Sequence, residues 1–170
     1  MLVGLLSLAG CGSASDQAGE RDKMNLPGTA ELEPPPAPSP QQAAQLGSRD
    51  CGEVVELYLE ALGGRDYALA ARVWDDPAVD AARLESVFGG YNELQVEWTD
   101  PFIEGAAGSL YCTVAGKLTD AQDRTTPPIE GTLLLRRVND VPGATPEQLR
   151  WTLRSSTFVE QIERPDGTEP

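Results

Sequence analysis

The chain has 170 residues, with 27 acidic and 13 basic side chains, and its formal net charge at pH 7 is −14. This charge argues against binding to nucleic acid and against direct docking on anionic lipid headgroups. The chain contains no histidine, which excludes Ser-His-Asp catalysis, Cys-His catalysis and histidine-containing metal sites.

Residues 1–10 form an apolar segment that ends in Leu8-Ala9-Gly10 and is followed by Cys11. The segment is shorter than the roughly 20 apolar residues that a membrane-spanning helix needs, and it fits the apolar region of a signal peptide. A Leu-Ala-Gly-Cys ending resembles the lipobox of bacterial lipoproteins. The resemblance implies that residues 1–10 are removed and that Cys11 carries a lipid anchor in the bacterial cell envelope.

Two details refine this expectation. The first basic residue is Arg21, whereas a signal peptide carries Lys or Arg near its start, so we expect the natural start codon to lie upstream. No Asp follows Cys11, and in many Gram-negative lipoproteins an Asp there retains the protein in the inner membrane. The resemblance therefore implies the outer membrane, facing the periplasm. The alternative is an unprocessed apolar N-terminus with a chance cysteine.

Residues 11–50 are predicted to form a disordered tether between the lipid and a folded domain. They are rich in small and polar residues and include a proline-rich run at residues 34–40. Such a composition buries too little apolar surface to fold, and prolines favour the extended polyproline II conformation. A stiff spacer is the favoured interpretation, and a PxxP ligand at residues 35–38 is the alternative.

Residues 51–160 are predicted to fold, beginning with three helices. Apolar residues recur at helical spacing in residues 52–62, which Gly63-Gly64 terminates. A second helix is expected at 66–74 and a third from Asp76-Pro77 to residue 88.

The pattern then changes to that of β-strands. Strands are expected at residues 93–98, 109–119, 132–138 and 151–159, with turns at Asp100-Pro101 and at 104–108. Short connections without helices indicate an antiparallel sheet in an α+β domain, followed by a disordered tail at 161–170. Arg136 and Arg137 are expected to point to opposite faces of the third strand and to form no patch.

The order of these elements, with Gly-Gly-Arg-Asp-Tyr-Ala-Leu-Ala-Ala at residues 63–71, is similar to the NTF2-like (SnoaL-type, cystatin-like) superfamily. The resemblance covers about residues 51–160. It implies N-terminal helices followed by a curved, four-stranded antiparallel sheet, often with an apolar cavity between them. The superfamily includes isomerases, dehydratases, cyclases and binding modules, so the fold alone selects no function.

Two cysteines remain once Cys11 is assigned to the lipid. In an oxidising compartment Cys51 and Cys112 are predicted to form a disulfide. The alternative is a core residue at Cys112 and a free thiol at Cys51. The chain has no Cys-x-x-Cys motif and no phosphate-binding loop, so no metal or cofactor is expected.

Four aromatic residues are candidates to line an apolar ligand cavity, with ordinary core packing as the alternative: Tyr91, Trp98, Tyr111 and Trp151. Asp100 is a weak candidate for a catalytic carboxylate, because burial beside aromatic rings would raise its pKa. A turn role before Pro101 is the simpler interpretation of Asp100. The sequence thus predicts a non-enzymatic domain that binds a protein partner or a small apolar ligand. An isomerase- or dehydratase-type enzyme is the alternative.

Overall fold

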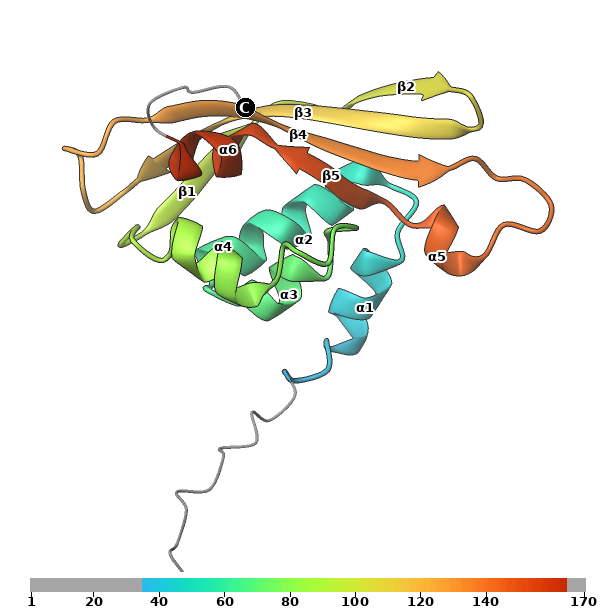
Figure 1. Cartoon of the computed structure of the whole chain (residues 1–170), viewed down its shortest axis with the longest axis horizontal. Coiled ribbons are helices and arrows are strands. Elements are labelled where there is room, and N and C mark those ends of the chain that lie inside the picture. Colours follow the sequence, from blue (N-terminus) through green and yellow to red (C-terminus); the bar gives the residue numbers. More distant parts are fainter. Residues whose placement is uncertain (1–34, 165–170) are drawn as a thin grey trace, which may run out of the picture. The chain divides into compact units, whose positions relative to one another are not determined.

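The computed structural model describes residues 35–164 (Figure 1). The predicted signal segment, Cys11 and most of the predicted tether therefore lie outside the described residues. Within the described range, no helix is both long and apolar enough to cross a membrane. The helices are α1 Pro40–Leu46, α2 Cys51–Gly63, α3 Tyr67–Ala71, α4 Ala81–Phe88, α5 Pro146–Leu149 and α6 Thr157–Glu163.

The strands form one antiparallel sheet in the order β1-β3-β4-β5. β3 (Ser109–Asp120) pairs on one side with β4 (Ile129–Val138), which in turn pairs with β5 (Thr152–Ser156). On its other side β3 pairs with both β1 (Leu94–Trp98) and β2 (Phe102–Ala106), so these two strands share one edge of the sheet. The domain is α+β, with a curved antiparallel sheet that is not closed, as the sequence predicted.

The core lies between the sheet and helices α2, α3 and α4, which cover one of its faces (Figure 1). The register shows which strand residues face the helices. Cys112 pairs with Leu135, and Leu135 pairs with Leu153; all three are at most 1% exposed. Since neighbouring strand residues point to opposite faces, Tyr111 and Arg136 belong to the other face.

A disulfide joins Cys51 in the first turn of α2 to Cys112 in β3, with 6.6 Å between the two Cα atoms. This is the pairing that the sequence predicted. The bridge closes a loop with a sequence separation of 61 residues. In the chain-entropy description such a closure stabilises the fold by about 4 kcal/mol. The disulfide therefore fixes α2, the longest helix of the domain, to the central strand of the sheet.

The predicted tether, 11–50, extends too far into the folded domain. Residues 40–46 form α1, which begins with a capping box between Ser39 and Gln42 and has Pro40 in its first turn. Leu46 packs against the core. The proline-rich composition predicts a spacer, but Ser39-Pro40-Gln41-Gln42 is also a helix start.

The C-terminal end of the domain also differs from the prediction. The predicted strand 151–159 ends at Ser156, whose hydroxyl accepts a hydrogen bond from the backbone N–H of Val159 and so caps α6. Phe158 and Val159 are both buried, which a strand with one covered face cannot achieve for neighbouring residues. α6 extends to Glu163, so the predicted disordered tail, 161–170, begins too early.

Strand β2 was missed, so the sheet has five strands and not four. All five of its residues are exposed, which removes the alternating pattern that identifies a strand. The turn predicted at 104–108 comprises only Ala107 and Gly108. Their positive φ angles of 46° and 83° reverse the chain direction directly between β2 and β3.

Two helices are shorter than predicted. α3 ends at Ala71, because Trp74 forms a parallel bridge with Leu153 beside β5. The third helix begins only after Asp80, whose carboxylate accepts a hydrogen bond from the N–H of Arg83. Asp76 instead caps a preceding turn by accepting from Ala78.

Candidate functional site

The four aromatic residues proposed as a cavity lining lie in different parts of the domain. Tyr91 precedes β1 and is partly buried; its carbonyl oxygen accepts a 2.6 Å hydrogen bond from Arg65. Tyr111 lies on the face of β3 opposite Cys112. Trp151 is 2% exposed and belongs to the core, whereas Trp98 at the end of β1 is 39% exposed. Of the four, Trp98 offers the most accessible ring.

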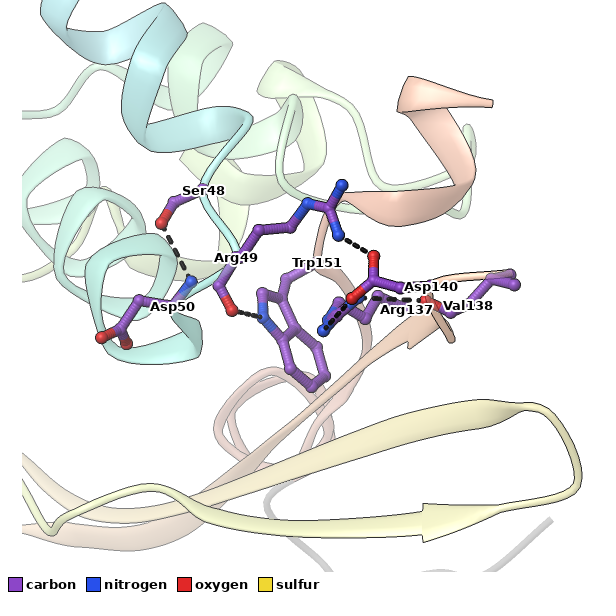
Figure 2. Close-up of polar contacts among 7 residues, drawn as sticks. All are labelled: Ser48, Arg49, Asp50, Arg137, Val138, Asp140 and Trp151. Atoms are coloured by element: carbon purple, nitrogen blue, oxygen red, sulfur yellow. Dashed lines mark hydrogen bonds and ion pairs between the residues drawn. The ribbon is translucent and has the colours of Figure 1, made fainter. Parts of the chain in front are cut away.

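Trp151 connects the start of β5 to the segment between α1 and α2 (Figure 2). Its indole Nε1 donates a 3.0 Å hydrogen bond to the carbonyl oxygen of Arg49. The guanidinium of Arg137 lies 5.4 Å from the centre of the indole ring, a cation–π arrangement. Asp140 forms ion pairs with both Arg49 and Arg137. Trp151 is therefore part of a structural junction and not of a ligand cavity.

Trp98 borders a broad, open depression of about 770 Å³ that extends over β1, β3 and β4 to α6. One end of its indole lies near Gly52 in the first turn of α2, since a Cβ built on Gly52 would be 3.8 Å from Cη2 of Trp98. The depression is lined by Glu97, Trp98, Thr99, Ala115, Gly116, Lys117, Glu130, Gly131, Thr132, Thr157 and Gln161.

Small and hydroxyl-bearing residues give the depression its width. Ala115 and Gly116 on β3 lie opposite Thr132 and Gly131 on β4, so no bulky side chain rises between these strands. Glu97, Lys117 and Glu130 are register partners on β1, β3 and β4. Because neighbouring strand residues point to opposite faces, their side chains lie on the face opposite to that of Trp98. The face that carries Trp98 can thus offer a flat aromatic ring and the hydroxyl group of Thr157, which lies 2.9 Å from a Cβ built on Gly131.

The carboxylate nominated from the sequence does not have the surroundings of a catalytic base. Asp100 is exposed in the connection between β1 and β2 and is not enclosed by a cavity.

Asp120 is the buried carboxylate among the described residues, with 6% of its surface exposed. It accepts hydrogen bonds from the backbone N–H groups of Asn92, Glu93, Gln122 and Asp123. These bonds favour the ionised form and lower its pKa to about 2. Asp120 therefore stays charged at neutral pH and holds the start of β1 to the end of β3. In the sequence, the only hint of this role is that Asp120 precedes a turn, whose backbone N–H groups an aspartate can accept from.

A second buried polar group, Tyr58 on α2, was not singled out from the sequence. It is 1% exposed, and its ring packs edge-on against Trp74 with 6.4 Å between the ring centres. Burial raises the pKa of its hydroxyl. Neither the Tyr58 hydroxyl nor Nε1 of Trp74 has a partner in hydrogen-bonding geometry among the described residues. A phenol that is closed off from solvent and protonated at neutral pH is not available to a ligand.

No protein-family model and no curated protein matches this chain. Among solved structures, the chain is similar to a protein from Thiobacillus denitrificans that is assigned as a calcium/calmodulin-dependent protein kinase type II association domain. The identity is 15% and the TM-score 0.43, over 62% of this chain and 90% of that one. It is also similar to a protein from Streptomyces avermitilis that is assigned as a dehydratase of the NTF2-like family. Here the identity is 15% and the TM-score 0.42, over 62% and 88% of the two chains.

A third similar structure is Bd1075 from Bdellovibrio bacteriovorus. It is 11% identical with a TM-score of 0.44, and the match covers 64% of this chain but 38% of that one. The three thus include a member of the superfamily that the sequence resembles. At these identities and scores they carry no argument about what this chain binds or does.

Proposed function

We propose that the protein is a lipid-anchored lipoprotein of the bacterial cell envelope, facing the periplasm from the outer membrane, whose domain binds a partner or a small ligand without catalysing a reaction. The Leu-Ala-Gly-Cys sequence at residues 8–11 supports the anchor. The disulfide between Cys51 and Cys112 is consistent with an oxidising compartment.

The observation that carries the binding role is the exposure of Trp98 beside a depression. Tryptophan is enriched among the residues that dominate binding energies, because its large rigid ring buries much area at little entropic cost. The other two tryptophans, Trp74 and Trp151, are only 8% and 2% exposed. Trp98 is therefore the tryptophan placed to contact a ligand, which we expect to bury the indole and to meet the hydroxyl groups beside it.

The carboxylates of the described domain favour binding over acid–base catalysis. Asp120, with a pKa of about 2, is a very weak base, and its oxygens are already engaged by backbone N–H groups. Asp100 is exposed. An isomerase or dehydratase of the type considered from the sequence would need a carboxylate with a raised pKa facing an enclosed site.

Native mass spectrometry of the protein released from its own membranes tests the binding role. We expect a bound species on the wild-type chain that is lost in Trp98→Ala. Phe102→Ala is the matched control, because Phe102 is 64% exposed and lies outside the depression. A bound species that survives Trp98→Ala, or one that Phe102→Ala removes equally, would contradict the proposed site.

A further inference from the structure

Strand β2 lies at an edge of the sheet and carries exposed apolar side chains (Figure 1). It pairs with β3 and packs against no other helix or strand of the described chain to a comparable extent. Phe102 is 64% exposed and Ile103 49%. Natural proteins usually protect an edge strand by lysine, proline, a bulge or a covering segment. β2 contains none of these; Pro101 stands before the strand, its one charged residue is Glu104, and its register with β3 is uninterrupted.

The turn after β2 determines which of its backbone groups bond to β3. Ala107 and Gly108 both have positive φ angles and form a two-residue hairpin turn, so Ala106 and Ser109 on either side of it exchange hydrogen bonds. Hydrogen-bonded and non-hydrogen-bonded pairs alternate along an antiparallel ladder. The even-numbered residues of β2 are therefore the ones that bond to β3.

The N–H and C=O groups of Ile103 and Gly105 consequently point away from β3. The neighbouring edge at the end of β1 has the same phase, because the N–H of Thr99 donates a 2.9 Å hydrogen bond to the carbonyl oxygen of Ala115, another odd-numbered residue of β3. Within residues 35–164, no hydrogen bond reaches the outward groups of β2. An edge with unpaired backbone groups is a template for a further strand.

A second copy of the chain fits this edge poorly. Two β2 strands can exchange hydrogen bonds only through Ile103 and Gly105, because these residues carry the outward groups. The antiparallel register that pairs the whole strand then places Glu104 opposite its own counterpart, and like charges opposite each other destabilise a sheet. A shifted register pairs only residues 102–104 or 104–106, since it brings in Pro101, which has no N–H, or the turn at residue 107.

We propose that the β2 edge binds an extended segment of another protein, which adds to the sheet as a strand and carries a basic residue opposite Glu104. In such complexes main-chain hydrogen bonds supply affinity and alternate side chains supply specificity. A basic residue opposite Glu104 forms a favourable cross-strand pair beside Tyr111, and the net charge of −14 attracts a basic segment. Apolar residues of the partner cover Phe102 and Ile103. The surface is separate from the Trp98 depression, which no residue of β2 lines.

The test uses the full-length protein and a synthetic peptide with blocked ends, Ser-Thr-Val-Lys-Val-Val-Thr, whose lysine aligns with Glu104 in the antiparallel register. The matched probe has glutamate in place of the lysine. We expect the lysine peptide to bind saturably and to slow hydrogen exchange at the amides of Ile103 and Gly105, but not at the Glu104 amide, which already bonds to β3. Equal binding of the two peptides, or no binding of either, would overturn the proposal. So would sedimentation of a dimer that Ile103→Lys dissociates, since a second copy would then occupy the edge.

Variants of exposed residues locate the peptide. Glu104→Lys should bind the lysine peptide about tenfold more weakly and the glutamate peptide more tightly, because the cross-strand charge pair is reversed. Ile103→Lys protects the edge and should also weaken binding. Val141→Lys is its matched control, because Val141 is 50% exposed and lies in the loop after β4; equal affinity of these two variants would overturn the site. Trp98→Ala should bind the peptide as the wild type does, and a loss there would place the peptide in the Trp98 depression instead.

Discussion

The carbonyl oxygen of Arg49 accepts a hydrogen bond from the indole of Trp151, which lies 102 residues later in the chain. This bond ties the segment between α1 and α2 to the start of β5 (Figure 2). Asp50, the next residue, caps α2 by accepting from the N–H of Gly52. The residues just before α2 therefore belong to the folded domain.

We predict that removing this segment destabilises the domain. A chain of residues 51–164 loses the partner of the Trp151 indole and the Asp50 cap, at a combined cost of about 2 kcal/mol relative to residues 35–164. Urea unfolding of the two chains measures the difference. Equal unfolding free energies would show that α1 and its connection contribute nothing to stability.

The disulfide gives a second prediction. In a Cys11→Ser protein, thiol counting under denaturing, non-reducing conditions should find no free thiol, because Cys51 and Cys112 are bonded. Reduction should lower the unfolding free energy by about 2–5 kcal/mol, the usual effect of losing a native disulfide. Two free thiols in the unreduced protein would contradict the bridge.

Replacing Tyr58 by Phe, unlike breaking the disulfide, is not expected to lower the unfolding free energy. Within residues 35–164 the buried hydroxyl of Tyr58 has no partner in hydrogen-bonding geometry, so Tyr58→Phe removes a desolvated polar group and leaves the ring in place. We expect unchanged stability or a gain of up to about 1 kcal/mol. Tyr58→Ala, which empties the same core position, should cost about 3–5 kcal/mol, as aromatic truncations do. A loss above about 1 kcal/mol for Tyr58→Phe would reveal a bond that the hydroxyl makes.

The ionised carboxylate of Asp120 should account for part of the loss of folding stability in acid. Its pKa in the folded protein is about 2, below the value of 3.8 that it has when unperturbed. The stabilisation is therefore fully present above pH 3.8 and is lost as the pH falls through about 2. Melting temperatures of the wild type and Asp120→Asn should converge on acidification through this window. A difference between them that stays constant from neutral pH to pH 2 would assign the acid sensitivity to other carboxylates.

The elements that the sequence predicted well are those with a regular apolar pattern. The helix beginning near Cys51 and the strand ending at Trp98 both show one, and the cysteine count led to the correct disulfide. β2 and α1 lack such a pattern, since β2 is exposed throughout and α1 buries no residue completely. An apolar pattern cannot identify such elements, although the capping box of Ser39 and Gln42 is a local signal for α1.

The candidate sites were harder to predict than the fold. Trp98 was selected for its residue type, yet only the structure distinguishes its exposed ring from the buried ring of Trp151. A depression of about 450 Å³ brings Arg136 on β4 close to Glu147 on α5. That proximity depends on how the chain returns through α5, which no spacing rule describes.

Intact mass spectrometry measures the proposed lipid anchor at Cys11 directly. The gene, expressed in its own host, should give a membrane-bound protein that begins at Cys11 and carries the added mass of a diacylglyceryl and an acyl group. Cys11→Ser should lose both the added mass and the membrane association. An unmodified mass for the wild-type protein, or membrane association unchanged in Cys11→Ser, would contradict the proposed lipoprotein.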